Sequence, residues 1–173
     1  VARALDATHT WLVLACDLPA QQALLARLRE SGARVIEVRL DEPFAALDEM
    51  RYTVGSKGAP DFLSLAAELD ERGLRPQRIL HLWSFGPRAR VRGPHDWRRD
   101  AWVSAYPNDL WLDFSSLLLV GRAFFAGPPG VRVCAVSSDM QAVPGGRANH
   151  PEKAVLLGAC RAIPRAYPGV ECT

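Results

Sequence analysis

The fold class of this chain is decided by the stretch Trp11-Leu12-Val13-Leu14-Ala15-Cys16. This continuous apolar run has the length of a strand and is typical of a strand covered on both faces. Leucines at helical spacing follow over residues 18–30, and Gly32 stands where a helix stop belongs. Residues 34–38 carry the β-branched Val35, Ile36 and Val38 and predict a second strand. This succession predicts a strand–helix–strand unit, with a right-handed crossover in a parallel sheet.

The same alternation continues along the chain. Further strands are expected at residues 51–54, 78–83 and 132–136. A helix that stops at Gly73 is marked by apolar side chains at helical spacing: Phe62, Leu65, Ala66 and Leu69. A second, largely apolar helix is expected to open at Asn108 or Asp109, to run through Phe125, and to stop at Gly127-Pro128-Pro129-Gly130. The order of elements predicts an α/β sandwich with a mostly parallel sheet.

The last segment, residues 149–169, predicts a helix that starts at Pro151, with Asn149 or His150 as its cap. Its apolar side is expected to consist of small and aliphatic residues: Ala154, Leu157, Ala159, Cys160 and Ile163. Gly158 predicts close approach by another backbone, and Pro164 predicts a kink or an end near Ile163. Residues 169–173 resemble the start of a further strand.

Composition limits the classes of function. The chain has 173 residues, 49% of them hydrophobic, which predicts one ordered domain over 1–173. A net charge of +2 argues against nucleic acid or a membrane surface as the partner, and no apolar run reaches the roughly 20 residues of a membrane span. No signal peptide is visible. The cysteines (Cys16, Cys134, Cys160 and Cys172) are scattered and mostly in apolar segments, which predicts reduced buried thiols, a cytoplasmic location and no metal site.

A nicotinamide cofactor would need a glycine-rich turn after the first strand, because its pyrophosphate approaches the backbone at the helix N-terminus. The turn in this chain, Cys16 to Gln21, contains no glycine. Asp17 would repel the phosphates, and Pro19 removes a backbone donor. We therefore expect no cofactor at this turn, and we expect Asp17 to act as an ordinary helix N-terminal residue.

Residues 136–154 share the spacing of a short-chain dehydrogenase active site, in which a serine follows a strand and a tyrosine precedes a lysine by four residues on a helix. Ser137 and Ser138 follow a strand, and Lys153 stands at the start of a helix. Asn149 occupies the tyrosine position, and an amide cannot act as a general acid near neutral pH. No catalytic residue is therefore expected.

Other candidate sites have simpler interpretations. The loop from Arg88 to Arg99, which includes Trp97, is either a solvated loop or a docking surface. His81, on a buried strand, is expected to be a hydrogen-bonded core histidine, and the remaining histidines (His9, His95 and His150) lie apart from other metal-binding residue types. Asp113, with Ser115 or Ser116, shows no histidine nearby to complete a nucleophilic triad.

The chain resembles the ketoreductase region of modular polyketide synthases, and more narrowly the N-terminal structural subdomain of that region. The resemblance covers essentially the whole chain. It is carried by Arg78-Ile79-Leu80-His81-Leu82-Trp83, by Asp113-Phe114-Ser115-Ser116-Leu117-Leu118 with Arg122-Ala123-Phe124, and by Pro151-Glu152-Lys153-Ala154 with Leu157-Gly158 and Ile163-Pro164-Arg165-Ala166-Tyr167-Pro168. Family members usually carry a glutamate where Ala166 stands, so that contact is absent here.

The resemblance implies a truncated Rossmann-like, three-layer fold without cofactor or catalysis, a pseudo-ketoreductase. It also implies adjacent synthase domains as partners: a catalytic ketoreductase subdomain, a methyltransferase or another processing domain. A rival interpretation is a self-contained flavodoxin-like domain or small enzyme with a ligand at the carboxyl ends of its strands, near Asp17, Ser84, Ser137 and Ser138. A third is an adaptor that docks through Arg90 and Arg92.

Overall fold

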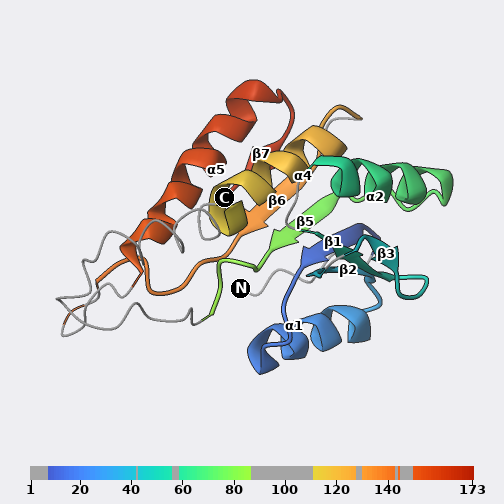
Figure 1. Ribbon diagram of the computed structural model, residues 1–173, viewed down its shortest axis with the longest axis horizontal. Helices are drawn as coiled ribbons and strands as arrows, with labels where there is room; N and C mark the ends of the chain where they lie inside the picture. Colours follow the sequence, from blue (N-terminus) through green and yellow to red (C-terminus); the bar gives the residue numbers. More distant parts are fainter. Residues whose placement is uncertain are drawn as a thin grey trace.

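A computed structural model describes residues 8–41, 43–55, 59–86, 111–127, 130–142, 144 and 150–173. Its centre is a seven-stranded sheet in the order β3-β4-β2-β1-β5-β6-β7 (Figure 1). The strands are β1 (Thr10–Leu14), β2 (Arg34–Leu40), β3 (Ala45–Ala46), β4 (Arg51–Val54), β5 (Arg78–His81), β6 (Arg132–Ala135) and β7 (Glu171–Cys172). All neighbouring pairs are parallel except β3 with β4. Without β3, the spatial order is that of the doubly wound Rossmann sheet.

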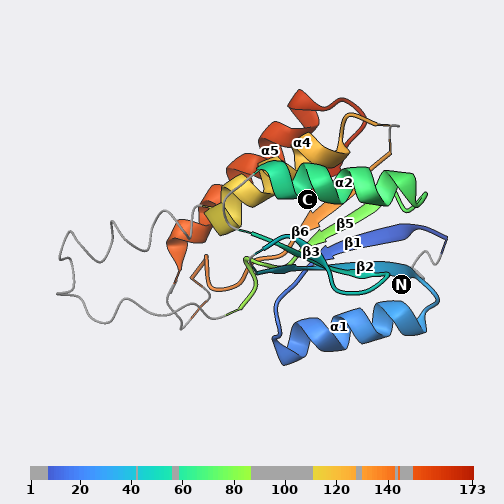
Figure 2. The same cartoon turned by 45° about the vertical axis from the view of Figure 1, so that its right-hand side comes forward.

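Within the described residues, four α-helices cover the sheet unequally. They are α1 (Pro19–Glu30), α2 (Ala59–Glu71), α4 (Ser116–Phe124) and α5 (Val155–Ala166); a π-helical turn, η1 (Trp111–Ser115), leads into α4, and a 3-10 turn, η2 (Pro151–Ala154), leads into α5. Figure 2 shows α1 on one face of the sheet and α2, α4 and α5 on the other.

The direction of the crossovers explains this division of the helices. The chain steps toward one edge from β1 through β2 to β4, and toward the other edge from β4 through β5 and β6 to β7. Right-handed crossovers in opposite directions place their connections on opposite faces. Between β2 and β4, the described residues hold β3 and no helix, so α1 has no described neighbour over β2 and β4.

The apolar core forms two layers that follow from the alternation along the strands. Leu12, Ile36 and Ile79 face α2, α4 and α5, whereas Val13 and Leu80 face α1. The helical positions predicted from periodicity in α2 are all buried: Phe62, Leu65, Ala66 and Leu69. These findings confirm the predicted fold class, an α/β, Rossmann-like three-layer sandwich with a mostly parallel sheet.

The last helix differs from its prediction in three ways. Its buried positions are Leu156, Ala159 and Ile163, while Ala154 and Leu157 are exposed. The helix continues past Pro164 to Ala166, because Pro164 is exposed and the next bond of the ladder, from Tyr167 N–H to Ile163 O, is intact at 2.8 Å. Gly158 is exposed, and a Cβ added there would meet nothing within 4 Å, so no backbone among the described residues approaches it.

The cysteines also differ from expectation. Cys16 and Cys134 are exposed, and Cys160 and Cys172 are half-buried, so none of the four is a fully buried thiol. All four are free. Cys134 is exposed because it points to the α1 face of β6, where the described part of the chain provides no covering helix.

Candidate functional site at the carboxyl edge of the sheet

The turn between β1 and α1 is filled by the side chain of Gln21, which is 1% exposed. Its Oε1 accepts a hydrogen bond from Cys16 N–H at 2.7 Å. Its Nε2 donates to the carbonyl oxygens of Leu82 at 3.0 Å and Phe85 at 2.8 Å. The side-chain amide therefore uses a backbone donor of the turn that would otherwise be available to a phosphate, and it ties the turn to the loop after β5.

Leu18 closes the N-terminus of α1. It occupies the N-cap position, no side chain caps the helix, and Pro19 follows at the first helical position. A Cβ added to Gly86 would lie only 2.3 Å from Leu18 Cδ1, which shows how closely this leucine packs on the loop after β5. Leu18 and Gln21 therefore pack together at the turn between β1 and α1 and against the loop after β5.

Asp17 does not act as a helix-terminal residue. Its side chain is 73% exposed and forms an ion pair with Arg39, with 2.8 Å between Asp17 Oδ1 and Arg39 Nη1. This corrects the expectation from the sequence. The helix starts two residues later at Pro19, and the carboxylate points instead toward the cation at the end of β2.

Lys153 is 0% exposed, although a lysine near a helix start is usually solvated. Its Nζ donates to the carbonyl oxygens of Gly86 at 2.9 Å and Ser138 at 3.1 Å. The backbone N–H of Gly86 in turn donates to Ser138 Oγ at 3.0 Å. Lys153 thus joins the loops after β5 and β6. Asn149, the residue at the tyrosine position, lies outside the described residues.

Two other serines at this edge have buried hydroxyl oxygens. Within the described residues, Ser84 Oγ and Ser137 Oγ have no partner, and Ser84 is 1% exposed. A ligand at the strand ends was expected near Asp17, Ser84, Ser137 and Ser138. In the structure, the carbonyl oxygen of Ser138 accepts a hydrogen bond from Lys153, and Asp17 forms an ion pair with Arg39.

His81 and Ser116 form a buried pair that the sequence did not reveal. Both are 0% exposed, and His81 Nε2 lies 2.8 Å from Ser116 Oγ. Ser116 Oγ donates its proton to Leu112 O at 2.6 Å, so we assign Nε2 of His81 as the donor to the serine. A serine hydroxyl that accepts a hydrogen bond from a histidine N–H cannot pass its own proton to that nitrogen. The histidine therefore does not activate this serine as a nucleophile.

This pair confirms His81 as a hydrogen-bonded core residue, and it corrects the expectation that Ser116 has no histidine nearby. The two residues are 35 positions apart, and the packing of α4 over β5 brings them together.

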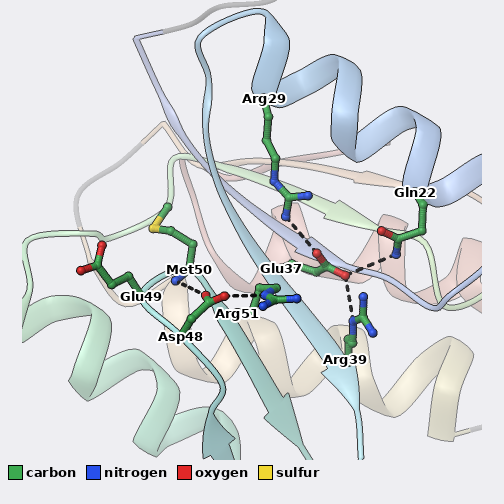
Figure 3. Close-up of a pocket in the computed structure, with 8 residues that line it drawn as sticks. All are labelled: Gln22, Arg29, Glu37, Arg39, Asp48, Glu49, Met50 and Arg51. Atoms are coloured by element: carbon green, nitrogen blue, oxygen red, sulfur yellow. Dashed lines mark hydrogen bonds and ion pairs between the residues drawn. The ribbon is translucent and has the colours of Figure 1, made fainter.

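A charged pocket of about 540 Å³ lies on the α1 face, away from this edge. It is lined by Gln22, Arg29, Glu37, Arg39, Asp48, Glu49, Met50 and Arg51 (Figure 3). Its floor is Glu37, which is 1% exposed and accepts hydrogen bonds from Arg29 and Arg39, each at 2.9 Å, and from Gln22 Nε2 at 3.3 Å. Arg51 forms an ion pair with Asp48 at the rim, 2.5 Å apart.

Two opposing effects act on the pKa of Glu37. Burial raises it, and the hydrogen bonds from Arg29, Arg39 and Gln22 lower it by more, so the pKa lies below its ordinary value. The side chain is therefore a carboxylate at neutral pH. The pocket lies where the connection from β2 to β4 carries no described helix. Glu37 and Arg39 alternate along β2, and Arg51 is opposite Glu37 on β4. The other charges come from α1 (Arg29) and from the turn before β4 (Asp48 and Glu49).

The remaining predicted features fall outside these sites. The Arg88–Arg99 loop and His95 lie outside the described residues. Across the part of the chain that the structure describes, no three His, Cys, Asp or Glu side chains gather in a way that could hold a metal ion. None of the described helices has the length and apolar character needed to cross a membrane.

Residues 10–90 match the family model described as beta-ketoacyl synthase-like, N-terminal. No curated protein sequence matches the chain significantly. A structure of the adenylation, ketoreductase and pseudo-Asub domains of a keto acid-selecting NRPS module is similar at a TM-score of 0.78 and 20% identity, over 94% of this chain and 13% of that one.

Two further structures share the fold. An N-terminal ketoreductase from the macrolactin assembly line has a TM-score of 0.64 at 19% identity, over 93% of this chain and 30% of that one. A short-chain dehydrogenase/reductase from Serratia marcescens has a TM-score of 0.61 at 14% identity, over 91% and 71%. The comparisons confirm the resemblance to ketoreductase regions of modular synthases, and the chain spans less than a third of the length of the first two structures.

Proposed function

We propose that this chain is a non-catalytic structural subdomain of a modular synthase ketoreductase, which scaffolds a neighbouring catalytic ketoreductase half or a methyltransferase in polyketide biosynthesis. It binds no cofactor of its own, and its residues 1–173 act as one subdomain. The assignment as a structural subdomain of a modular synthase is supported by the similarity to synthase ketoreductases and by the family match over residues 10–90.

The observation that carries the proposal is the use of the former site for internal contacts. Gln21 and Leu18 fill the turn where a dinucleotide would lie, and Lys153 is bound to backbone carbonyls. A ligand would have to displace a buried amide, a leucine and a buried ammonium together. Each group is hydrogen-bonded or packed within the chain, so the displacement would leave buried polar groups unpaired.

The scaffolding role is supported by surfaces that the described residues leave uncovered. On α5, Leu157 is 41% exposed, and Gly158 beside it has free space around its Cα. At one edge of the sheet, β7 pairs with β6 on one side only. We expect the neighbouring domain to contact the outer side of α5 and this edge.

Titration of the purified chain with NADPH tests the absence of a cofactor site. We expect no saturable binding at micromolar concentrations and no reduction of a β-ketoacyl mimic. A short-chain dehydrogenase measured in parallel serves as the positive control. Micromolar binding to this chain would overturn the proposal.

Co-expression with the catalytic half of the parent synthase tests the scaffold. We expect the two pieces to co-purify and the catalytic half to lose solubility or activity alone. Leu157→Asp should weaken the complex while leaving the Tm of the isolated chain unchanged. Its matched control is Leu63→Asp, an exposed leucine (43%) on α2. A catalytic half that is equally active and soluble without this chain would contradict the scaffolding role.

A further inference from the structure

The charged pocket on the α1 face lies away from the edge of the sheet where Rossmann-like folds take their ligands. Its floor, Glu37, is the central residue of β2, and Arg51, opposite Glu37, is the first residue of β4. Arg29 stands in the last turn of α1, which leads into β2. Ligands of such sheets bind outside the carboxyl ends of the strands. A ligand in this pocket would therefore use a different part of the fold.

Three arginines from three different elements meet in the charged pocket (Figure 3). Arg29 comes from α1, Arg39 from β2 and Arg51 from β4. Their side chains are 43%, 29% and 49% exposed, respectively, so solvent reaches each of them. Arginine is favoured where the oxygens of a phosphate or carboxylate group are bound in pairs, because its planar guanidinium presents parallel N–H donors. The convergence of three such groups indicates an anion as the ligand.

Glu37 holds two of the three guanidiniums in place. Its Oε2 accepts a hydrogen bond from Arg29 Nη2 and its Oε1 accepts one from Arg39 Nε, each at 2.9 Å. The Glu37 side chain is 1% exposed and also accepts a hydrogen bond from Gln22 Nε2 at 3.3 Å. The two arginines are thus fixed before a ligand arrives, which reduces the loss of side-chain entropy when a ligand binds.

The carboxylates of the pocket leave its arginines incompletely neutralised. Glu37 is shared by two of them, and Asp48 pairs with the arginine at the rim. Figure 3 shows the Glu49 side chain directed away from the three guanidiniums. Asp17 pairs with Arg39 from outside the pocket lining, but it is 73% exposed, and water screens such a pair strongly. Three positive groups therefore share two close carboxylates within the pocket.

Each of the three guanidiniums also has N–H donors that no group among the described residues accepts. Arg29 donates through Nη2, Arg39 through Nε and Nη1, and Arg51 through Nε. A guanidinium carries N–H groups on all of its nitrogens. Nη1 of Arg29, Nη2 of Arg39 and both Nη atoms of Arg51 can therefore donate to a ligand.

We propose that the charged pocket binds the phosphate group of a small phosphorylated molecule. A phosphate monoester presents three terminal oxygens, one for each guanidinium, whereas a carboxylate presents only two. Its charge at neutral pH, about −1.5 to −2, also exceeds that of a carboxylate. The pocket volume of about 540 Å³ is in the range of small-molecule sites. This binding site does not depend on the scaffolding role.

Titration of the purified full chain with inorganic phosphate, at an ionic strength held constant with sodium chloride, tests the proposal. Two-dimensional NMR of the backbone amides should show saturable shifts in the last turn of α1, in β2 and at the start of β4. The Tm should rise with phosphate concentration, because the folded state alone has the site. Sodium acetate at the same ionic strength should bind at least about tenfold more weakly, because it lacks the third oxygen.

Arg29→Gln and Arg51→Gln should each weaken phosphate binding by about tenfold or more, because each removes a charged donor. Arg27→Gln is the matched control: it removes the same charge from an exposed position of α1 outside the pocket lining, and affinity should stay within about twofold. Arg51, at the rim, keeps the test valid if Arg29→Gln, which takes a partner from Glu37, fails to fold.

Circular dichroism and the Tm without phosphate show whether each variant is folded. The proposal is overturned by the absence of saturation up to about 10 mM phosphate, which corresponds to very weak affinity. It is equally overturned if folded Arg51→Gln binds phosphate as tightly as the wild type does, or if acetate binds as tightly as phosphate.

Discussion

Lys153 Nζ lies 2.9 Å from the carbonyl oxygen of Gly86, a residue 67 positions earlier in the chain. The contact joins the start of the last helical segment to the loop after β5. A second carbonyl, that of Ser138, completes the arrangement at 3.1 Å. A lysine that stands at the spacing of a catalytic residue therefore connects two loops of the scaffold.

Lys153→Met should destabilise the chain by about 2–4 kcal/mol, because the carbonyls of Gly86 and Ser138 lose a charged donor in a buried place. Urea unfolding followed by circular dichroism measures the change. Arg161→Met, on the exposed side of α5, is the control and should change stability by less than about 0.5 kcal/mol. Equal stability of Lys153→Met and the wild type would show that this contact does not stabilise the chain.

Glu37→Gln should destabilise the chain at pH 7 by about 1–3 kcal/mol, since it leaves two arginines around a neutral amide in a partly buried place. The carboxylate pKa lies below its ordinary value of 4.5 in the folded state. The stability that the Glu37 carboxylate contributes is therefore fully present above its pKa in the unfolded state, and it is lost as pH falls through its pKa in the folded state.

The pH dependence separates this effect from a simple packing change. The stability difference between wild type and Glu37→Gln should be constant at neutral pH and shrink below about pH 4.5. Glu49→Gln, at an exposed residue that lines the same pocket, is the control and should change stability at pH 7 by less than about 0.5 kcal/mol. A difference that persists unchanged at low pH would argue against the ion pairs as its cause.

Gly86→Ala should destabilise the chain by about 1–3 kcal/mol. Gly86 has φ +126°, which disfavours a side chain, and the added Cβ would lie 2.3 Å from Leu18 Cδ1. Adding Leu18→Ala to Gly86→Ala should recover the part of the lost stability that comes from the steric clash. The part that comes from the strained backbone at residue 86 should remain. Strict additivity of the two variants in thermal unfolding would indicate that Leu18 does not press on Gly86.

Ser116→Ala should destabilise the chain by about 1–3 kcal/mol, because His81 Nε2 loses its acceptor in a fully buried place. Ser115→Ala, in the neighbouring π-helical turn, serves as the comparison. The readout is the midpoint of guanidinium unfolding. A larger loss for Ser115→Ala than for Ser116→Ala would contradict the assigned contact.

Local pattern was sufficient for most of the elements. The apolar run that forms β1 and the leucines of α1 were predicted because strand and helix periodicities are written into neighbouring residues. Gly32 and Gly73 were expected as helix stops, and both adopt positive φ. The short strand β3 was missed, since two alanines carry no strand signal and owe their conformation to β4.

The rules that failed were those applied to single residues. Pro164 was expected to end or kink the helix near Ile163, and the helix does not end there: it runs to Ala166, and Tyr167 N–H donates to Ile163 O at 2.8 Å. Gly158 was expected to mark a close approach, but its surroundings are open. In both cases the outcome depends on what packs against the residue, which its identity does not state.

The sequence by itself determined the fold class and the absence of glycine from the turn between β1 and α1, because strand periodicity and residue identity are local properties of the chain. Only the tertiary structure decided which polar groups are buried and which partners they bind. The burial of Lys153 between two carbonyls, the pairing of His81 with Ser116, and the arginines around Glu37 each join residues from separate elements. Burial and hydrogen-bond partners are set by packing between distant segments, and no spacing along the chain encodes them.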